Sequence, residues 1–367
     1  MMRSLSGFVD RIWPGRISRP FPPWVMLLGA LATLFLFFFS IRLLGAANDA
    51  LSAEITPYLR TVIDGELSAL GVGWLGALVL MNGSVVAALS ISLLHSGLVN
   101  DAEFYMMISG TRLGGSGIVF LIGVLDHLHR RHAGLEDSTS MGVLTFLITH
   151  SIYIPATVLG FLLLPFLATY MLDPRIMDRL TVQTFELFTP VTDFIIQLLG
   201  GWLSIILSIL ILFLSLKLFA EVVCCLDGNV LRRNLLVFLE RKWIAFFAGM
   251  LITMATASVA FSLGIFVPLY NRKVIKKKVM IPYIMGANIG TFSDTLLAGI
   301  ILETVDGVLV IFILTGLASI VTIIALAAGD TFTKAIEFLQ NRIVGSWNLF
   351  LAFMAALILA PLLLIIF

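Results

Sequence analysis

The sequence predicts an all-α integral membrane protein with about seven transmembrane helices plus two re-entrant hairpins in an inverted repeat. The first observation is composition: 59% of the 367 residues are hydrophobic and only 12% are charged, whereas soluble domains are about half apolar and a quarter charged. The second is that the apolar residues form long runs, and the third is that basic residues gather in alternate loops. A net charge of +1 gives no reason to expect a nucleic-acid partner.

Nine apolar runs are long enough to enter or cross a bilayer, whose roughly 30 Å core needs about 20 helical residues. The segment before them is polar and basic, and it lacks the short apolar stretch and cleavage site of a signal peptide. The runs are residues 24–46, 67–99, 104–125, 140–171, 194–223, 244–270, 279–300, 308–329 and 345–367.

The basic residues predict the topology, because loops rich in Lys and Arg stay in the cytoplasm. If the N-terminus is cytoplasmic and runs 67–99 and 244–270 each leave on the side they enter, most of the 23 Lys and Arg residues fall inside. Residues 47–66 are then an outer loop, and 126–139 and 224–243 are inner loops. The alternative topology has nine transmembrane helices and a weaker separation of basic residues between the two sides.

This topology divides the chain into six parts. Both predicted hairpins contain glycines that interrupt a helix, and such backbone survives at membrane depth only inside protein or beside a cavity. The parts are a cytoplasmic N-terminal segment (1–23), a first inverted repeat with hairpin 67–99 (24–171), an extracytoplasmic connector (172–193), a second inverted repeat with hairpin 244–270 (194–329), a cytoplasmic amphipathic helix (330–344) and a C-terminal transmembrane helix (345–367).

Two pairs of stretches support the repeat. Residues 84–91 (SVVAALSI) are similar to 258–265 (SVAFSLGI), and residues 110–115 (GTRLGG) are similar to 286–291 (GANIGT). The order is the same in both copies, and the charge bias puts the two hairpins on opposite sides. Opposed repeats with broken helices are typical of secondary transporters, whose substrate site lies near the midplane.

Residues 286–291, with Ser293, Asp294 and Thr295 close behind, resemble the GANIGT signature of the type II sodium/phosphate cotransporters. The resemblance covers about 67–125 and 244–300. That family also carries a Gln-Ser-Ser-Ser motif in each re-entrant hairpin. Here the first hairpin reads Met-Asn-Gly-Ser and the second Ala-Thr-Ala-Ser, so each keeps only part of the motif.

The resemblance implies sodium-coupled uptake of inorganic phosphate or a similar small oxyanion by alternating access, with sodium as coupling ion and no cofactor. A dehydrated anion needs donors such as hydroxyls and helix N-termini, and sodium, a hard cation, prefers oxygen ligands. We therefore expect substrate contacts from Ser84, Ser258, Arg112, Asn82 and Thr256, and sodium contacts from Asn288, Thr291, Ser293 and Asp294. For Gly110, Gly114 and Gly290, helix packing is an equal alternative.

Arg112 and Asp294 are ionisable groups inside predicted membrane runs, and such groups are functional candidates. Three roles stay open for Arg112, which occupies the position equivalent to Asn288. It binds the anion through its planar fork, its fixed charge replaces a cation, or it pairs with Asp294 as a structural tie.

Other polar residues have simpler interpretations. His150 is expected to bond a helix carbonyl rather than carry protons, and the HLHRRH tract at 127–132 is expected to be a cytoplasmic loop rather than a metal site. Glu186 and Asp193 are placed at the outer interface, NRKVIKKK (271–278) on anionic lipid, and 331–342 on the inner surface. The pair Cys224–Cys225 has no assigned role.

The function predicted is transport and not enzymatic catalysis, because no Walker A, HExxH or GxSxG motif occurs. The alternatives are another anion or proton coupling, or a non-transporting membrane partner or sensor that retains the fold. The expected partners are a small inorganic anion, sodium and membrane lipid, and small-residue faces leave a homo-oligomer open. The expected location is the plasma or inner membrane, with a cytoplasmic N-terminus and an extracytoplasmic C-terminus.

Overall fold

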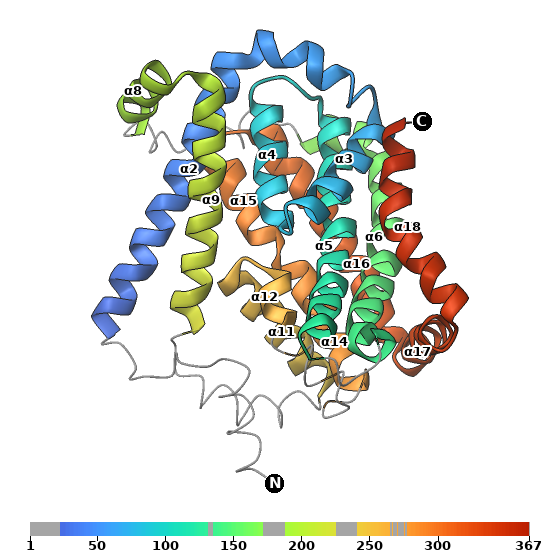
Figure 1. Ribbon diagram of the computed structural model, residues 1–367. Helices are drawn as coiled ribbons and strands as arrows, with labels where there is room; N and C mark the ends of the chain where they lie inside the picture. Colours follow the sequence, from blue (N-terminus) through green and yellow to red (C-terminus); the bar gives the residue numbers. More distant parts are fainter. Residues whose placement is uncertain are drawn as a thin grey trace.

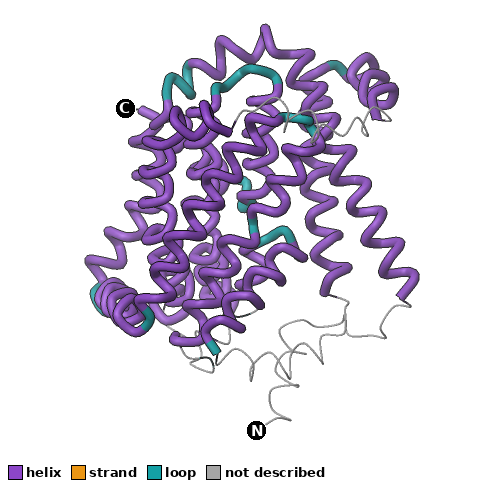
Figure 2. The backbone as a smooth tube through the Cα atoms, turned by 180° about the vertical axis from the view of Figure 1, so that it is seen from behind, coloured by secondary structure: helices purple, strands orange, loops and turns teal. Residues whose placement is uncertain are grey.

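A computed structural model describes residues 23–130, 135–171, 188–224, 241–264 and 277–366, together with Phe266, Tyr270 and Ile275. Within these residues the chain is helical and contains no strand, so the predicted all-α class is confirmed. Figure 2 shows helices throughout, joined by short loops, some of which lie in the interior of the molecule.

Seven of the described helices are long and apolar enough to cross a membrane. The fifth of them combines α14 and α15, which are separated only by a break at Thr291. They are α2 (Pro23–Arg60), α5 (Asp101–Arg130), α6 (Leu135–Met171), α9 (Gly201–Cys224), α14 (Lys277–Gly290) with α15 (Phe292–Ile301), α16 (Val305–Ala328) and α18 (Trp347–Ile366).

Two pairs of short helices form hairpins that reach into the molecule from opposite ends (Figure 1). The first hairpin consists of α3 (Glu66–Val79) and α4 (Gly83–His95), and the second begins with α11 (Lys242–Thr256) and α12 (Val259–Gly264). They occupy the runs that the charge bias marked as re-entrant. Neither α3 nor α11 has the length needed to cross a bilayer alone.

Glycines bring each hairpin into close contact with the Gly-rich helix that follows it. A Cβ at Gly110 or Gly114 of α5 would overlap a main-chain oxygen of α3, and a Cβ at Gly286 or Gly290 of α14 would overlap one of α11. Small residues permit such approach between helices in lipid. The packing interpretation of these glycines is therefore correct.

The two repeats correspond at a constant separation along the chain. Gly110 corresponds to Gly286, and the turn residue Met81 (φ 52°) corresponds to Ala257 (φ 49°), which both adopt the left-handed conformation. At this separation the partner of Ser258 is Asn82. The similarity that aligned Ser84 with Ser258 is therefore out of register by two residues.

Several predicted boundaries are wrong. Helix α2 continues to Arg60 through most of the predicted outer loop 47–66, and only a short turn precedes α3. Run 194–223 is not one helix, because Gly200 (φ 77°) separates α9 from α8 (Thr189–Leu199). Within the predicted inner loop 126–139, α5 reaches Arg130 and α6 begins at Leu135.

The predicted amphipathic helix is present as α17 (Asp330–Val344). It lies at the same end of the molecule as the start of α2, and α18 then leads to the opposite end (Figure 1). Glu186, Cys225 and most of the 271–278 segment lie outside the described residues, as does nearly all of the N-terminal segment 1–23.

Candidate functional site

The tips of the two hairpins touch. Ser84 Oγ, in the first turn of α4, donates a hydrogen bond to the main-chain oxygen of Ala257, 3.0 Å away at the turn of the second hairpin. Asn82 shapes this tip, because its Oδ1 accepts hydrogen bonds from the N–H groups of Ser84 (2.9 Å) and Val85 (3.2 Å) and so caps α4. The sequence thus brings together residues of both repeats in the middle of the molecule.

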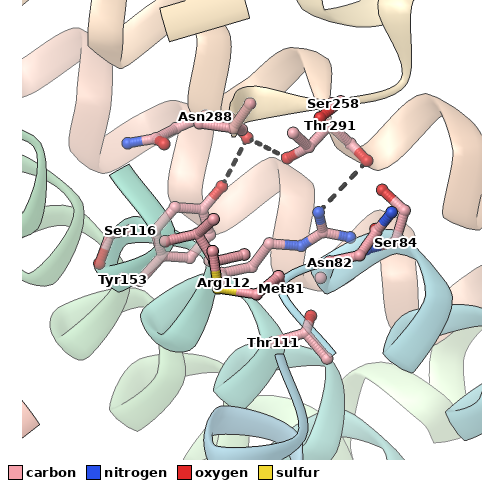
Figure 3. A pocket seen from close by; sticks show the side chains of 14 residues that line it. Met81, Asn82, Ser84, Thr111, Arg112, Ser116, Tyr153, Ser258, Asn288 and Thr291 are labelled. Atoms are coloured by element: carbon pink, nitrogen blue, oxygen red, sulfur yellow. Dashed lines mark hydrogen bonds between the residues drawn. The ribbon is translucent and has the colours of Figure 1, made fainter. Parts of the chain in front are cut away.

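A cavity of about 40 Å³ lies beside this contact and holds roughly three water-sized groups. Polar side chains from both hairpins, from α5 and α6 and from the end of α14 reach it (Figure 3). Its lining is Met81, Asn82, Gly83, Ser84, Thr111, Arg112, Gly115, Ser116, Ile118, Tyr153, Ser258, Val259, Asn288 and Thr291.

Arg112 extends from α5 towards the break between α14 and α15, and its side chain is only 7% exposed. Its Nη1 donates to the main-chain oxygen of Thr291 (3.3 Å), and its Nη2 donates to Thr295 Oγ1 (2.7 Å). The guanidinium also lies 4.4 Å from the centre of the Phe292 ring, a cation–π arrangement. Its Nε is buried without a hydrogen bond.

Asp294, a buried carboxylate in the first turn of α15, interacts electrostatically with Arg112. Its Oδ1 accepts hydrogen bonds from the Thr295 N–H (2.6 Å) and hydroxyl (3.0 Å). No direct ion pair joins Arg112 to Asp294 in the described structure. Thr295 links them instead, because its hydroxyl accepts from Arg112 and donates to Asp294.

Asn288, in the last turn of α14, and Thr291, at the break that follows it, line the same cavity. The main-chain oxygen of Asn288 accepts from Tyr153 OH and from Thr291 Oγ1, both at 2.8 Å (Figure 3). The Asn288 side chain donates from Nδ2 to Thr149 Oγ1, 2.9 Å away on α6. These bonds fix the carbonyl and amide groups that the sequence assigns to sodium.

Six of the nine residues proposed from the sequence line the cavity, namely Asn82, Ser84, Arg112, Ser258, Asn288 and Thr291. The other three lie outside the lining. Thr256 Oγ1 donates to the oxygen of Ile252 in its own helix, and Ser293 Oγ donates to the oxygen of Gly290, the last residue of α14. Asp294 is not part of the lining, and its Oδ1 is joined to Arg112 through the Thr295 hydroxyl.

From the sequence, Tyr153 and Thr149 are not proposed at all, and Thr295 is noted beside the GANIGT motif but given no role. All three are polar residues in apolar runs, which is the signal that could have marked them. His150 behaves as the sequence predicted, since its Nδ1 lies 2.9 Å from the oxygen of Phe146, on whose ring the imidazole stacks.

Residues 211–356 match the family model described as Na+/Pi-cotransporter. This stretch includes the second hairpin, α14, α15, α16 and α17, whereas the first hairpin lies outside it. No curated protein and no solved structure matches the chain. The match supports a Na+/Pi cotransporter family assignment over these residues, and it confirms there the family resemblance predicted from the GANIGT motif.

Proposed function

We propose that this chain, with its Na+/Pi-cotransporter match in the C-terminal half, carries inorganic phosphate with sodium across a cell membrane by alternating access. The observation that supports this function best is the contact between two hairpin tips from opposite ends, beside a polar cavity that contains a buried arginine. Membrane segments that end midway and meet at a polar site suit a transporter better than a rigid membrane anchor.

Phosphate would bind between the tips. Ser84 and Ser258 supply hydroxyl groups, the N-terminal turn of α4 supplies a positive dipole end, and Arg112 supplies a full positive charge. The Ser84 hydroxyl, which now donates to Ala257, would turn to the anion when the second hairpin moves away.

Sodium would bind on the α14 side of the same cavity. The oxygens available there belong to Asn288 and Thr291, and hard cations take carbonyl, amide and hydroxyl oxygens as ligands. An anion and a cation in one small cavity stabilise each other, because their attraction is strong where water is excluded. Such mutual stabilisation would couple the two ions.

Alternating access requires that one hairpin can separate from the other. The tips are joined by the Ser84–Ala257 hydrogen bond, and such a bond contributes only about 1 kcal/mol net. Opening from either end would then expose the cavity to one side at a time. We place the start of α2 and α17 in the cytoplasm and the end of α18 outside, following the basic loops.

Radiolabelled phosphate uptake into proteoliposomes, with and without a sodium gradient, tests this function. We expect sodium-dependent uptake in the wild type and an increase of about tenfold or more in the KM for phosphate in Ser84→Ala, because a hydrogen bond to a charged group is lost. Ser208→Ala is the matched control, since this buried hydroxyl bonds its own helix α9 at Ile205.

The other outcomes separate the alternatives. Uptake driven by a proton gradient would show that protons, not sodium ions, are the coupling ion. Uptake of another oxyanion but not of phosphate would show that the substrate is that oxyanion. Phosphate binding without flux would identify a non-transporting protein that retains the fold. Each of these results would contradict the proposed function.

A further inference from the structure

We infer that Arg112 is a tethered cation that takes the place of one sodium ion beside the substrate cavity. This inference deepens the proposed function and rests on it for the identity of the ion. It explains why an arginine stands in the first repeat where the second repeat has the neutral residue Asn288.

The repeat symmetry isolates this charge pair. At the separation that relates the paired glycines, Arg112 corresponds to Asn288 and Asp294 corresponds to Ile118. Of this pair, the first repeat contributes Arg112 and the second contributes Asp294. Folding brings the two side chains to the same place. The symmetry-related positions, Asn288 and Ile118, are both neutral and hold no buried charge that must be balanced.

The contacts of Arg112 are those of a bound cation. Two of its three guanidinium nitrogens contact protein oxygens, namely a main-chain carbonyl of Thr291 and the hydroxyl of Thr295. These are the oxygen types that hard cations take as ligands. An arginine held ready for an anion would instead leave both nitrogens of its fork open to the cavity.

The carboxylate of Asp294 completes the set of oxygens. It is 4% exposed, its Oδ1 is joined to Arg112 through Thr295, and its Oδ2 is buried and accepts no hydrogen bond from a described residue. A buried carboxylate needs a countercharge, because ionised groups are costly away from water. Without Arg112, the three oxygen groups would surround a vacated space that sodium could fill.

The test is sodium-dependent thermal stability of the purified full-length protein in detergent, without phosphate, in sodium chloride or choline chloride of equal ionic strength. We expect Arg112→Ala to gain a sodium-dependent rise in melting temperature of roughly 3 °C over the wild-type response, because a bound ion stabilises the folded state. Arg112→Lys, which keeps a tethered charge, should show no gain. Adding Asp294→Asn to Arg112→Ala should remove it.

Two further variants keep the test decisive. Arg112→Asn copies the residue of the second repeat and replaces the alanine variant if that protein does not purify. Arg60→Ala is the matched control, because Arg60 also pairs with a buried acid, Glu103, but lies at the end of α2 and not among the residues that line the cavity. It should not gain a sodium response.

The inference is overturned if both neutral variants respond to sodium as the wild type does, or if Arg112→Lys gains the response as well. Because the measurement uses neither phosphate nor flux, it is independent of the uptake assay. A gain of sodium binding together with absent phosphate uptake would contradict the proposed function and leave the tethered cation standing.

Discussion

Single glycines decide how closely the hairpins pack. A Cβ at Gly286 would overlap the main-chain oxygen of Phe246, which cannot move without displacing α11, whereas nothing lies within 4 Å of a Cβ at Gly316. We expect Gly286→Ala to destabilise the protein by about 1–3 kcal/mol, as overpacking does. Melting temperature in detergent measures this, with Gly316→Ala as the control. Equal stability of the two variants would contradict the packing interpretation.

At the same scale, the sequence predicted residues that carry a local pattern and missed those that depend on tertiary contact. Asn288 and Thr291 stand in a recognisable motif and do line the cavity. Tyr153 belongs to no motif, and Thr295 follows the motif without an assigned role; the contacts of both depend on which helices meet around α14. No spacing along the chain encodes such a meeting.

Helix α17 carries a buried polar side chain, Gln340, that bonds residues outside the helix. Gln340 is fully buried and donates from Nε2 to the main-chain oxygen of Ser140 (2.7 Å) and to Tyr270 OH (3.0 Å). We expect Gln340→Ala to leave buried polar groups unpaired, at a cost of about 1–3 kcal/mol. In this variant, hydrogen exchange should become faster than in the wild type, and the increase should be larger in α17 than in α16.

An exposed ion pair between the first residue of α17 and α14 provides the control. Asp330 forms an ion pair with Lys278 at 3.0 Å, and both side chains are mostly exposed. The hydrogen bond and charge of Lys278 lower the pKa of Asp330, so any stabilisation is present above the ordinary pKa of the carboxyl and is lost as the pH falls through the lowered value. Because water and salt screen exposed pairs, Asp330→Asn should leave exchange in α17 unchanged. Equal exchange in the two variants would contradict the anchoring role of Gln340.

Hydropathy alone misplaced two element boundaries, the end of α2 and the break before α9. Hydropathy located α2 only to residue 46, but the helix continues with polar residues to Arg60, whose side chain pairs with Glu103 and bonds the oxygen of Leu98. Tertiary partners extend this helix beyond its apolar part. The break at Gly200 was missed because apolar residues continue on both sides of it.

For the whole molecule, the inverted-repeat topology predicts that the C-terminal end of α2 and helix α17 face opposite sides of the membrane. Tyr58, near the end of α2, is 70% exposed, and Lys334 lies on α17 at the opposite end of the molecule. In a chain whose Cys224 and Cys225 are replaced by serine, a cysteine at position 58 should react with a membrane-impermeant maleimide on intact cells. A cysteine at position 334 should react only after permeabilisation.

Cysteines at positions 84 and 258 then test whether the two hairpins share one cavity. Ser84 and Ser258 belong to hairpins that enter from opposite ends of the molecule, and both line the same cavity. Both cysteines should react with a small water-soluble thiol reagent, and phosphate together with sodium should slow both reactions, because the bound ions exclude the reagent. Protection of only one position, or exposure of both to lipid alone, would contradict a common site. The inverted-repeat topology is therefore tested more strictly by this experiment than by a count of helices, since it requires the two hairpins, far apart in the sequence, to respond to the same ligand.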